Sequence, residues 1–174
     1  MRRTARETKV GSVSVGGGAP VSVQSMANVD PHDAKAIVEQ ANACAERGCD
    51  IFRLTVPDLE AAKTLAEVKK SVAMPLVADI HFDYLCALAA LEAGADALRL
   101  NPGNIGSCER VQAVARAAKA AGAVFGVAPG FDPAVLAAAR EAGLEMVPGI
   151  ATASELSQAL TAGVKMVKFF PAEA

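Results

Sequence analysis

The chain has 174 residues, of which 52% are hydrophobic, with a formal net charge of −2 and an isoelectric point of about 5.7. This length suits one domain with a substantial core, although a complete eight-unit (βα) barrel usually needs about 250 residues. The lack of a basic excess argues against nucleic acid as a partner. No apolar run is long enough to span a bilayer and the N-terminus has no signal-peptide core, so we expect a cytoplasmic protein without a membrane partner.

Strand-like and helix-like segments alternate after a short β-hairpin predicted over residues 8–19. Strands are predicted near residues 21–25, 50–56, 75–80, 96–101, 124–128, 144–148 and 165–170. Helices are predicted near residues 32–47, 58–72, 83–93, 107–121, 132–142 and 152–162. The expected helix N-caps are Asp58, Asp83, Ser107, Asp132 and Thr152. A glycine follows five of the helices, where it can adopt the left-handed conformation that ends a helix.

Repeated strand–helix units of 20 to 28 residues predict an α/β fold with a parallel sheet. We interpret the chain as one domain, residues 1–174, forming a TIM-type (βα) barrel. Seven such strands are predicted and no eighth. Because eight strands are the common solution for closure, the barrel is expected to be incomplete or atypically closed.

Polar residues occupy every second position as several of these strands end. The pairs are Ser22 and Gln24, Arg53 and Thr55, Asp79 and His81, and Arg99 and Asn101. Side chains alternate between the two faces of a strand, so each pair lies on one face. The carboxyl ends of barrel strands carry the catalytic residues in TIM barrels, so this pattern predicts a site there.

Two guanidinium groups, those of Arg53 and Arg99, suit a phosphate or diphosphate because each offers a planar fork of donors. The alternative is an internal ion pair of either arginine with Asp79. His81 is a candidate general acid or phosphate donor, and the alternative for it is a structural role.

The loop Asn101–Gly106 contains Asn104 and directly precedes a helix, so its backbone N–H groups are candidates for anion binding. The alternative is an ordinary glycine-rich turn.

Lys168 lies on the same strand face as Met166 and Phe170. A lysine desolvated by such neighbours can act as a Schiff-base nucleophile, and the alternative is a lysine that reaches solvent.

Four cysteines occur, at positions 44, 49, 86 and 108, and none forms a Cys-x-x-Cys pair. Cys44, Cys86 and Cys108 fall on predicted helices and Cys49 at a strand entrance. We interpret them as small hydrophobic residues in a reducing compartment, and we expect no metal site.

Residues 1–122 resemble the barrel domain of 4-hydroxy-3-methylbut-2-enyl diphosphate synthase, an iron–sulfur enzyme of isoprenoid biosynthesis. The matching stretches include residues 23–26, 76–83 and 101–106, which read Val-Gln-Ser-Met, Leu-Val-Ala-Asp-Ile-His-Phe-Asp and Asn-Pro-Gly-Asn-Ile-Gly. The resemblance implies that a cyclic diphosphate is held at the barrel mouth. The residues that would hold it here are Arg53, Asp79, His81, Arg99, Asn101 and Asn104.

Residues 122–174 resemble a different family, 2-keto-3-deoxy-6-phosphogluconate aldolase. The matching stretches include Val147–Thr152 and Lys168–Glu173, which reads Lys-Phe-Phe-Pro-Ala-Glu. The resemblance implies that Lys168 would form a Schiff base with a 2-keto substrate. No carboxylate occupies the second-strand region, residues 52–55, where that family carries its acid/base glutamate.

Together the two resemblances suggest a chimera of two barrel enzymes joined near residue 122. The synthase family uses a [4Fe–4S] cluster whose cysteine ligands are not matched here, so we expect no cofactor in this chain. Three hypotheses follow: a diphosphate-binding barrel without redox activity, a Schiff-base lyase acting through Lys168, or a folded scaffold without activity. The expected ligand is a small phosphorylated or 2-keto acid molecule, and homo-oligomer formation is left open.

Overall fold

The structure is a computed structural model that describes residues 7–100 and 107–169, apart from the side chain of Cys108. Its internal contacts divide the chain into two compact units, residues 1–100 and residues 101–174. Each unit has its own helices and its own parallel strands.

The first unit begins with the predicted hairpin. Strands β1 (Thr8–Val10) and β2 (Val13–Val15) pair in antiparallel fashion, with Val10 opposite Val13. Gly11 opens the two-residue turn with φ of +55°, a conformation that glycine adopts without steric cost. A Cβ at this position would lie 2.9 Å from both Asp96 Oδ1 and Pro75 Cγ, so the turn lies directly against the residues next to two later strands.

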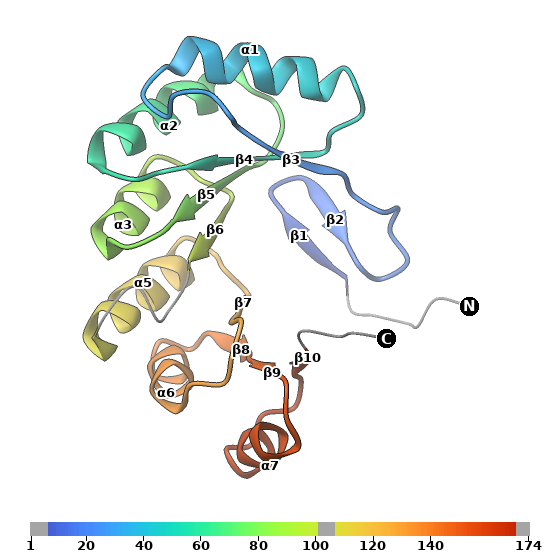
Figure 1. Ribbon diagram of the computed structural model, residues 1–174, viewed down its shortest axis with the longest axis vertical. Helices are drawn as coiled ribbons and strands as arrows, with labels where there is room; N and C mark the ends of the chain where they lie inside the picture. The colour runs from blue at the N-terminus through green and yellow to red at the C-terminus, as the bar shows by residue number, and fades with distance from the viewer. Residues whose placement is uncertain (1–6, 101–106, 170–174) are drawn as a thin grey trace. The chain divides into compact units, whose positions relative to one another are not determined.

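A four-stranded parallel sheet forms the centre of the first unit. Its strands are β3 (Gln24–Met26), β4 (Ile51–Thr55), β5 (Leu76–Ile80) and β6 (Ala97–Leu100), hydrogen-bonded in that order. The connecting helices are α1 (Ala34–Ala45), α2 (Leu59–Ser71) and α3 (Tyr84–Glu92), which lie along one side of the sheet (Figure 1). Each pair of successive strands is joined by a helix that returns the chain, which is the arrangement that parallel strands require.

The two faces of this sheet differ in chemistry because side chains alternate along each strand. One set of positions is apolar and almost completely buried: Phe52, Leu54, Leu76, Ala78 and Ile80. The other set carries the polar residues. The register places Thr55 opposite Asp79 and Asp79 opposite Arg99, so these three residues share one face.

The second unit contains helices α5 (Cys108–Ala120), α6 (Pro133–Glu141) and α7 (Ala153–Thr161). Strands β7 (Phe125–Val127) and β8 (Glu145–Val147) form one parallel pair, and β9 (Gly149–Ile150) and β10 (Lys168–Phe169) form another. Pro148 separates β8 from β9, and proline offers no backbone N–H to a sheet.

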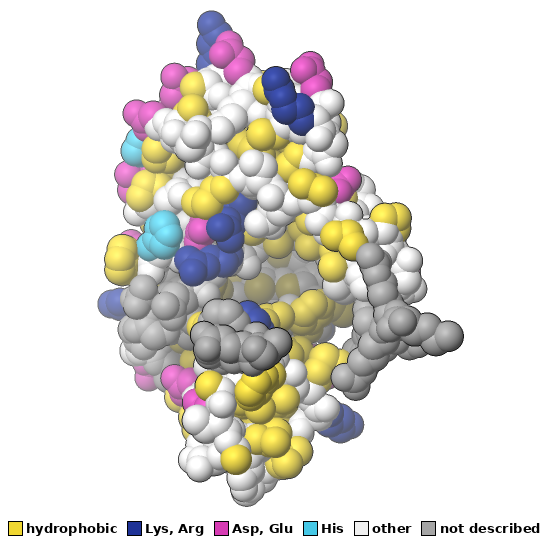
Figure 2. All heavy atoms as spheres, turned by 45° about the vertical axis from the view of Figure 1, so that its right-hand side comes forward, with side chains coloured by type: hydrophobic (Ala, Val, Ile, Leu, Met, Phe, Trp, Pro, Cys, Tyr) yellow, Lys and Arg dark blue, Asp and Glu magenta, His cyan; other side chains and the backbone are white. Residues whose placement is uncertain are grey.

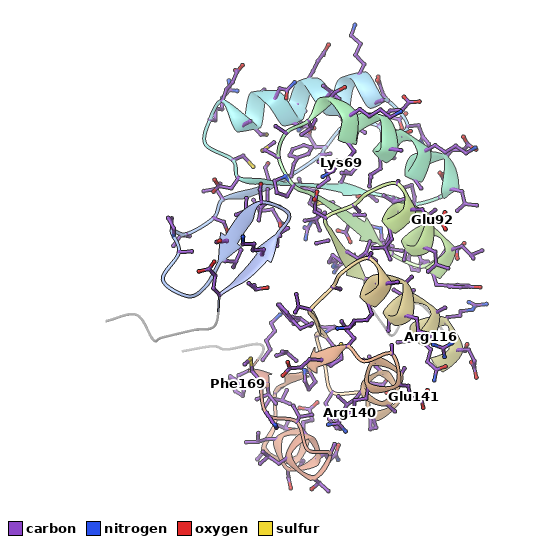
Figure 3. All side chains as sticks on the ribbon, turned by 180° about the vertical axis from the view of Figure 1, so that it is seen from behind. Lys69, Glu92, Arg116, Arg140, Glu141 and Phe169 are labelled. Carbon is purple, nitrogen blue, oxygen red and sulfur yellow. The ribbon has the colours of Figure 1, made fainter. Side chains whose placement is uncertain are left out.

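Two apolar clusters support the second unit. One consists of Leu136, Ile150, Ala159 and Val164, and the other of Ala115, Ala139 and Leu144. A polar contact also joins α5 to α6, since Gln112 Nε2 donates to Glu141 Oε2 at 2.6 Å. Within α5, Arg116 Nη2 donates to Gln112 Oε1 at 2.9 Å. Arg116 and Glu141 are labelled on these two helices in Figure 3.

The predicted α/β fold with parallel strands is confirmed. Each predicted strand and helix has a counterpart among the described residues, and β9 is an additional short strand. The strands of the described ranges form separate hydrogen-bonded ladders rather than one continuous sheet. Four of the expected N-caps accept backbone hydrogen bonds (Asp58, Asp83, Asp132 and Thr152), whereas Ser107 makes no such side-chain bond. In the described part of the chain, no helix has the length and apolar character needed to cross a bilayer.

Candidate functional site

The candidate site is centred on Asp79, whose side chain is only 4% exposed. Arg99 Nη1 donates a hydrogen bond to Asp79 Oδ1 at 3.0 Å. Arg53 Nε lies 3.5 Å from Asp79 Oδ2, and His81 Nε2 lies 3.8 Å from Asp79 Oδ1. One buried carboxylate is therefore shared by two guanidinium groups and has an imidazole close by.

The parallel register explains why these side chains meet. Arg53, Asp79 and Arg99 come from three adjacent strands, β4, β5 and β6, with β5 in the middle. His81 directly follows β5. All five positions of β5 are buried. Because a lone buried carboxylate is costly, the flanking arginines compensate for the charge that this central strand carries.

The charges of the site do not balance. Among the described residues two arginines face one carboxylate, which leaves an excess of one positive charge even with a neutral His81. The arginine side chains are 30% and 50% exposed, for Arg53 and Arg99 respectively, so solvent reaches part of each. Figure 2 shows basic side chains gathered beside an acidic and a histidine side chain on one face of the molecule. This arrangement is suited to an anion that accepts hydrogen bonds from both arginines.

Arg53 has further unused donor capacity. Its Nε is buried and makes no hydrogen bond to any described residue, because the 3.5 Å approach to Asp79 does not have hydrogen-bond geometry. Its Nη2 faces Met26 Sδ at 3.4 Å, and sulfur is a weak acceptor. A ligand oxygen would be a better partner than the thioether for the outer edge of this guanidinium group.

The internal ion-pair alternative considered for Arg53 and Arg99 is the arrangement present in the structure. It does not exclude ligand binding, since both arginine side chains are partly exposed, and the ligand-binding role stays a prediction. The His81 side chain is 40% exposed, and its ring lies 6.1 Å from that of Phe82 between centroids. Asn101 and Asn104, also predicted for this site, lie outside the described residues.

Lys168 does not have the apolar surroundings that a desolvated lysine requires. It lies on β10 next to Gly149 of β9, and its own side chain is exposed. Met166, expected to cover it, is 49% exposed, and Phe170 lies outside the described residues. The described residues therefore provide little cover for Lys168, and its role as a Schiff-base nucleophile stays a prediction.

Sequence reasoning missed a second group of titratable residues in the first unit. His32 lies between two carboxylates, with Nδ1 3.0 Å from Asp30 Oδ1 and Nε2 3.0 Å from Asp58 Oδ2. Hydrogen bonds to Asp58 and then to Asp30 raise the pKa of His32. The nearby Asp-Pro-His sequence was a local signal, but nothing local indicated that Asp58 would complete the group.

The described cysteines do not fit an iron–sulfur cluster. Cys44 lies on α1, Cys49 before β4 and Cys86 within α3, and burial is the main cause that raises the pKa of the Cys86 thiol. Cluster ligation needs thiolates that converge on one point. Among the described residues, no group of three or more His, Cys, Asp or Glu side chains is placed to hold a metal ion. No reaction step is therefore assigned to a cluster in this chain.

Comparison with known proteins decides the family. The sequence model of the GcpE TIM-barrel domain matches residues 5–160, which is most of the chain. The chain belongs to the GcpE TIM-barrel domain family. The match includes both strand-end arginines and continues past residue 122, where the resemblance to the aldolases begins. The proposed joining of two families near that residue stays a prediction.

Curated relatives carry the name 4-hydroxy-3-methylbut-2-en-1-yl diphosphate synthase (flavodoxin). The protein from Caldanaerobacter subterraneus subsp. tengcongensis is 51% identical over 122 residues, which cover 70% of this chain and 34% of that protein. The protein from Clostridium acetobutylicum is 56% identical over 114 residues, 66% of this chain and 33% of that protein. The chain thus spans about a third of the length of the curated relatives it matches.

Solved structures show only distant likeness. The 2-keto-3-deoxy-6-phosphogluconate aldolase of Zymomonas mobilis is 20% identical with a TM-score of 0.43, covering 86% of this chain and 57% of that chain. Mandelate oxidase is 14% identical with a TM-score of 0.46, covering 75% of this chain and 55% of that chain. These likenesses do not bear on function.

Proposed function

We propose that this GcpE-family chain binds a phosphoanion, and specifically the cyclic diphosphate of an isoprenoid-synthase reaction, at the face carrying Arg53, Asp79, His81 and Arg99. The observation that carries the proposal is the single buried carboxylate shared by the guanidinium groups of two partly exposed arginine side chains. The family match and the names of the relatives supply the diphosphate class of ligand.

Each described residue has a distinct part in this proposal. Asp79 holds the two arginines in place, since it is buried and reaches both. Arg99, the more exposed of the two, donates to an outer phosphate oxygen, and Arg53 donates through its Nη atoms. His81 supplies a further donor, or a proton when the imidazole is charged. Asn101 and Asn104, which lie outside the described residues, stay proposed ligands on the family resemblance alone.

The proposal is restricted to binding. The relatives named as synthases are about three times as long as the matched segment, and the described cysteines are not arranged as cluster ligands. Reductive ring opening needs an electron source, which the described side chains do not provide. The residues described here account for positioning a diphosphate and neutralising its charge.

Calorimetry with inorganic diphosphate and with a small cyclic diphosphate tests the proposal. Arg53→Ala and Arg99→Ala should each weaken binding by about 1.5–3 kcal/mol, the range for hydrogen bonds to charged groups. Arg47→Ala is the matched control. Arg47 carries the same charge, but it lies just after the C-terminus of α1, where its Nη1 donates to Ala43 O. Equal affinity in the wild type and both site variants would reduce these arginines to structural ion pairs.

The Schiff-base lyase remains the alternative, with a 2-keto acid as its substrate and Lys168 as its nucleophile. The exposed position of Lys168 does not favour it. The solved aldolase structures are too distant to add support.

A further inference from the structure

His32 lies in the loop between β3 and α1, and both of its ring nitrogens face carboxylate oxygens. Nδ1 is 3.0 Å from Asp30 Oδ1, while Nε2 is 3.1 Å from Asp58 Oδ1 and 3.0 Å from Asp58 Oδ2. A neutral imidazole carries one N–H and can donate to only one of these partners. The charged imidazolium donates to both, so this geometry is complete only when His32 is protonated.

The two carboxylates belong to different parts of the first unit. Asp30 lies in the same loop as His32, and it also accepts the backbone N–H of His32 at 2.9 Å. Asp58 is the N-cap of α2, where its Oδ1 accepts the backbone N–H of Ala61 at 2.9 Å. His32 therefore connects the β3–α1 loop to the start of the next helix, 26 residues further along the chain.

The same loop is fastened at two other points. Asn28 and Gln40 exchange hydrogen bonds, from Asn28 N to Gln40 Oε1 at 3.1 Å and from Gln40 Nε2 to Asn28 Oδ1 at 2.6 Å. The Ala27 N–H donates to the carbonyl oxygen of Arg53 at 2.8 Å. Neither of these contacts titrates near neutral pH, so His32 is the pH-sensitive contact among the three.

The other charged groups at the starts of the adjoining helices have partners of their own. On α1, Asp33 caps the helix by accepting the Ala36 N–H, and Lys35 lies 4.0 Å from Glu39. On α2, Glu60 pairs with Lys63 at 2.6 Å. The charges that act on His32 are those of Asp58 and Asp30, and both stabilise the imidazolium.

We propose that His32 is a pH-sensitive clasp that ties the β3–α1 loop to the N-terminus of α2 when its imidazole is charged and releases that loop when it is neutral. The direction of this pH dependence follows from the coupling between proton binding and folding. The pKa of His32 in the folded chain is raised above its ordinary value of 6.5, so the clasp stabilises the loop fully below that value. The stabilisation is lost as the pH rises through the raised folded pKa. The clasp involves no ligand, so it does not depend on the proposed diphosphate site.

Histidine NMR tests the electrostatic part. The chain has two histidines, and His81→Gln assigns their signals. The His32 signal should titrate above the 6.5 reference, and Asp58→Asn should shift its midpoint downward. Asparagine is as good an N-cap as aspartate, so this variant removes the charge and keeps the cap of α2. A midpoint at or below 6.5, or one that is unmoved in Asp58→Asn, would overturn the proposal.

Hydrogen exchange tests the loop itself. Between about pH 6 and about pH 9, the protection factors of amides in residues 27–33 should fall roughly two- to fivefold in the wild type, the scale of an exposed ion pair. His32→Gln should show the lower protection at both pH values and no pH step. Amides of β5 serve as the internal control, since that strand is completely buried. A pH step of the same size in His32→Gln and in the wild type would contradict the clasp.

Discussion

The buried carboxylate of Asp79 accepts a hydrogen bond at 3.0 Å from Arg99, a residue whose own side chain is half exposed. The negatively charged Asp79 side chain is therefore buried against the sheet, whereas the Arg99 side chain that balances its charge extends to the surface. Such an arrangement makes the carboxylate depend on its arginine partners for charge compensation, while the arginines keep donors for an external anion.

Asp79→Asn should destabilise the fold. The amide keeps the shape of the side chain, but it leaves Arg53 and Arg99 without a neutralising charge. We expect the free energy of unfolding to fall by about 1–3 kcal/mol, less than for a fully buried pair because both arginines are partly exposed. Urea denaturation measures this, with Glu67→Gln on the exposed face of α2 as the charge-matched control. Equal midpoints for the two variants would show that Asp79 is not the charge anchor of the site.

Gly11→Ala should weaken the contact between the N-terminal hairpin and the parallel sheet. The new Cβ would lie 2.9 Å from Asp96 Oδ1, and the residue would be held at φ of +55°. Gly18→Ala is the control, because Gly18 also has positive φ but a Cβ added there would have nothing within 4 Å. Strain of this kind costs about 1–3 kcal/mol. Thermal unfolding should show the larger loss of stability for Gly11→Ala. An equal loss of stability in the two variants would mean that the hairpin turn can move away from Asp96 and Pro75 without measurable strain.

Thr152 is the N-cap of α7, and it forms a capping box with Glu155. Thr152 Oγ1 accepts the Glu155 N–H at 3.2 Å, and Glu155 Oε2 accepts the Thr152 N–H at 2.9 Å. Thr152→Ala should cost about 1 kcal/mol of stability. Ser154→Ala removes a hydroxyl from the same helical turn and serves as the control in urea denaturation. A similar loss in both variants would argue against the cap.

The same box should respond to acid. Hydrogen bonds from the Ala151 N–H, and then from Thr152, lower the pKa of Glu155 below its ordinary value of 4.5. A lowered folded pKa means that the contribution is present above 4.5 and is lost as the pH falls through the folded value. Acid titration of the helical signal should therefore show less pH dependence in Glu155→Gln than in the wild type. Identical acid profiles would show that the carboxylate contributes nothing.

Lys168 should not react selectively with a 2-keto acid. Selective imine formation needs a lysine that lies in a pocket holding the substrate, and the Lys168 side chain is exposed. After treatment with pyruvate and borohydride, peptide mass spectrometry should find similar modification of Lys168 and of Lys165, which is also exposed. Modification concentrated on Lys168 and lost in Lys168→Ala would restore the lyase hypothesis.

Local patterns in the sequence were enough to predict the elements of this fold and the shared face of its polar residues. Alternation by two along residues 51–55 and 76–80 placed Arg53, Thr55 and Asp79 on one side of the sheet, because the period of a strand does not depend on its neighbours. Aspartates before apolar helices predicted the caps for the same reason, since capping is a contact between residues two or three apart.

Tertiary structure decided which of these residues meet. The register of β4, β5 and β6 lets Arg53 and Arg99 share one carboxylate, and register depends on pairing between segments that are distant in sequence. His32 was overlooked because its partner Asp58 lies 26 residues away and is brought close only when the first helix packs beside the second. The exposure of Lys168 was likewise not readable from the sequence, because apolar neighbours along a strand do not determine what packs against its face; burial is a property of the assembled layers.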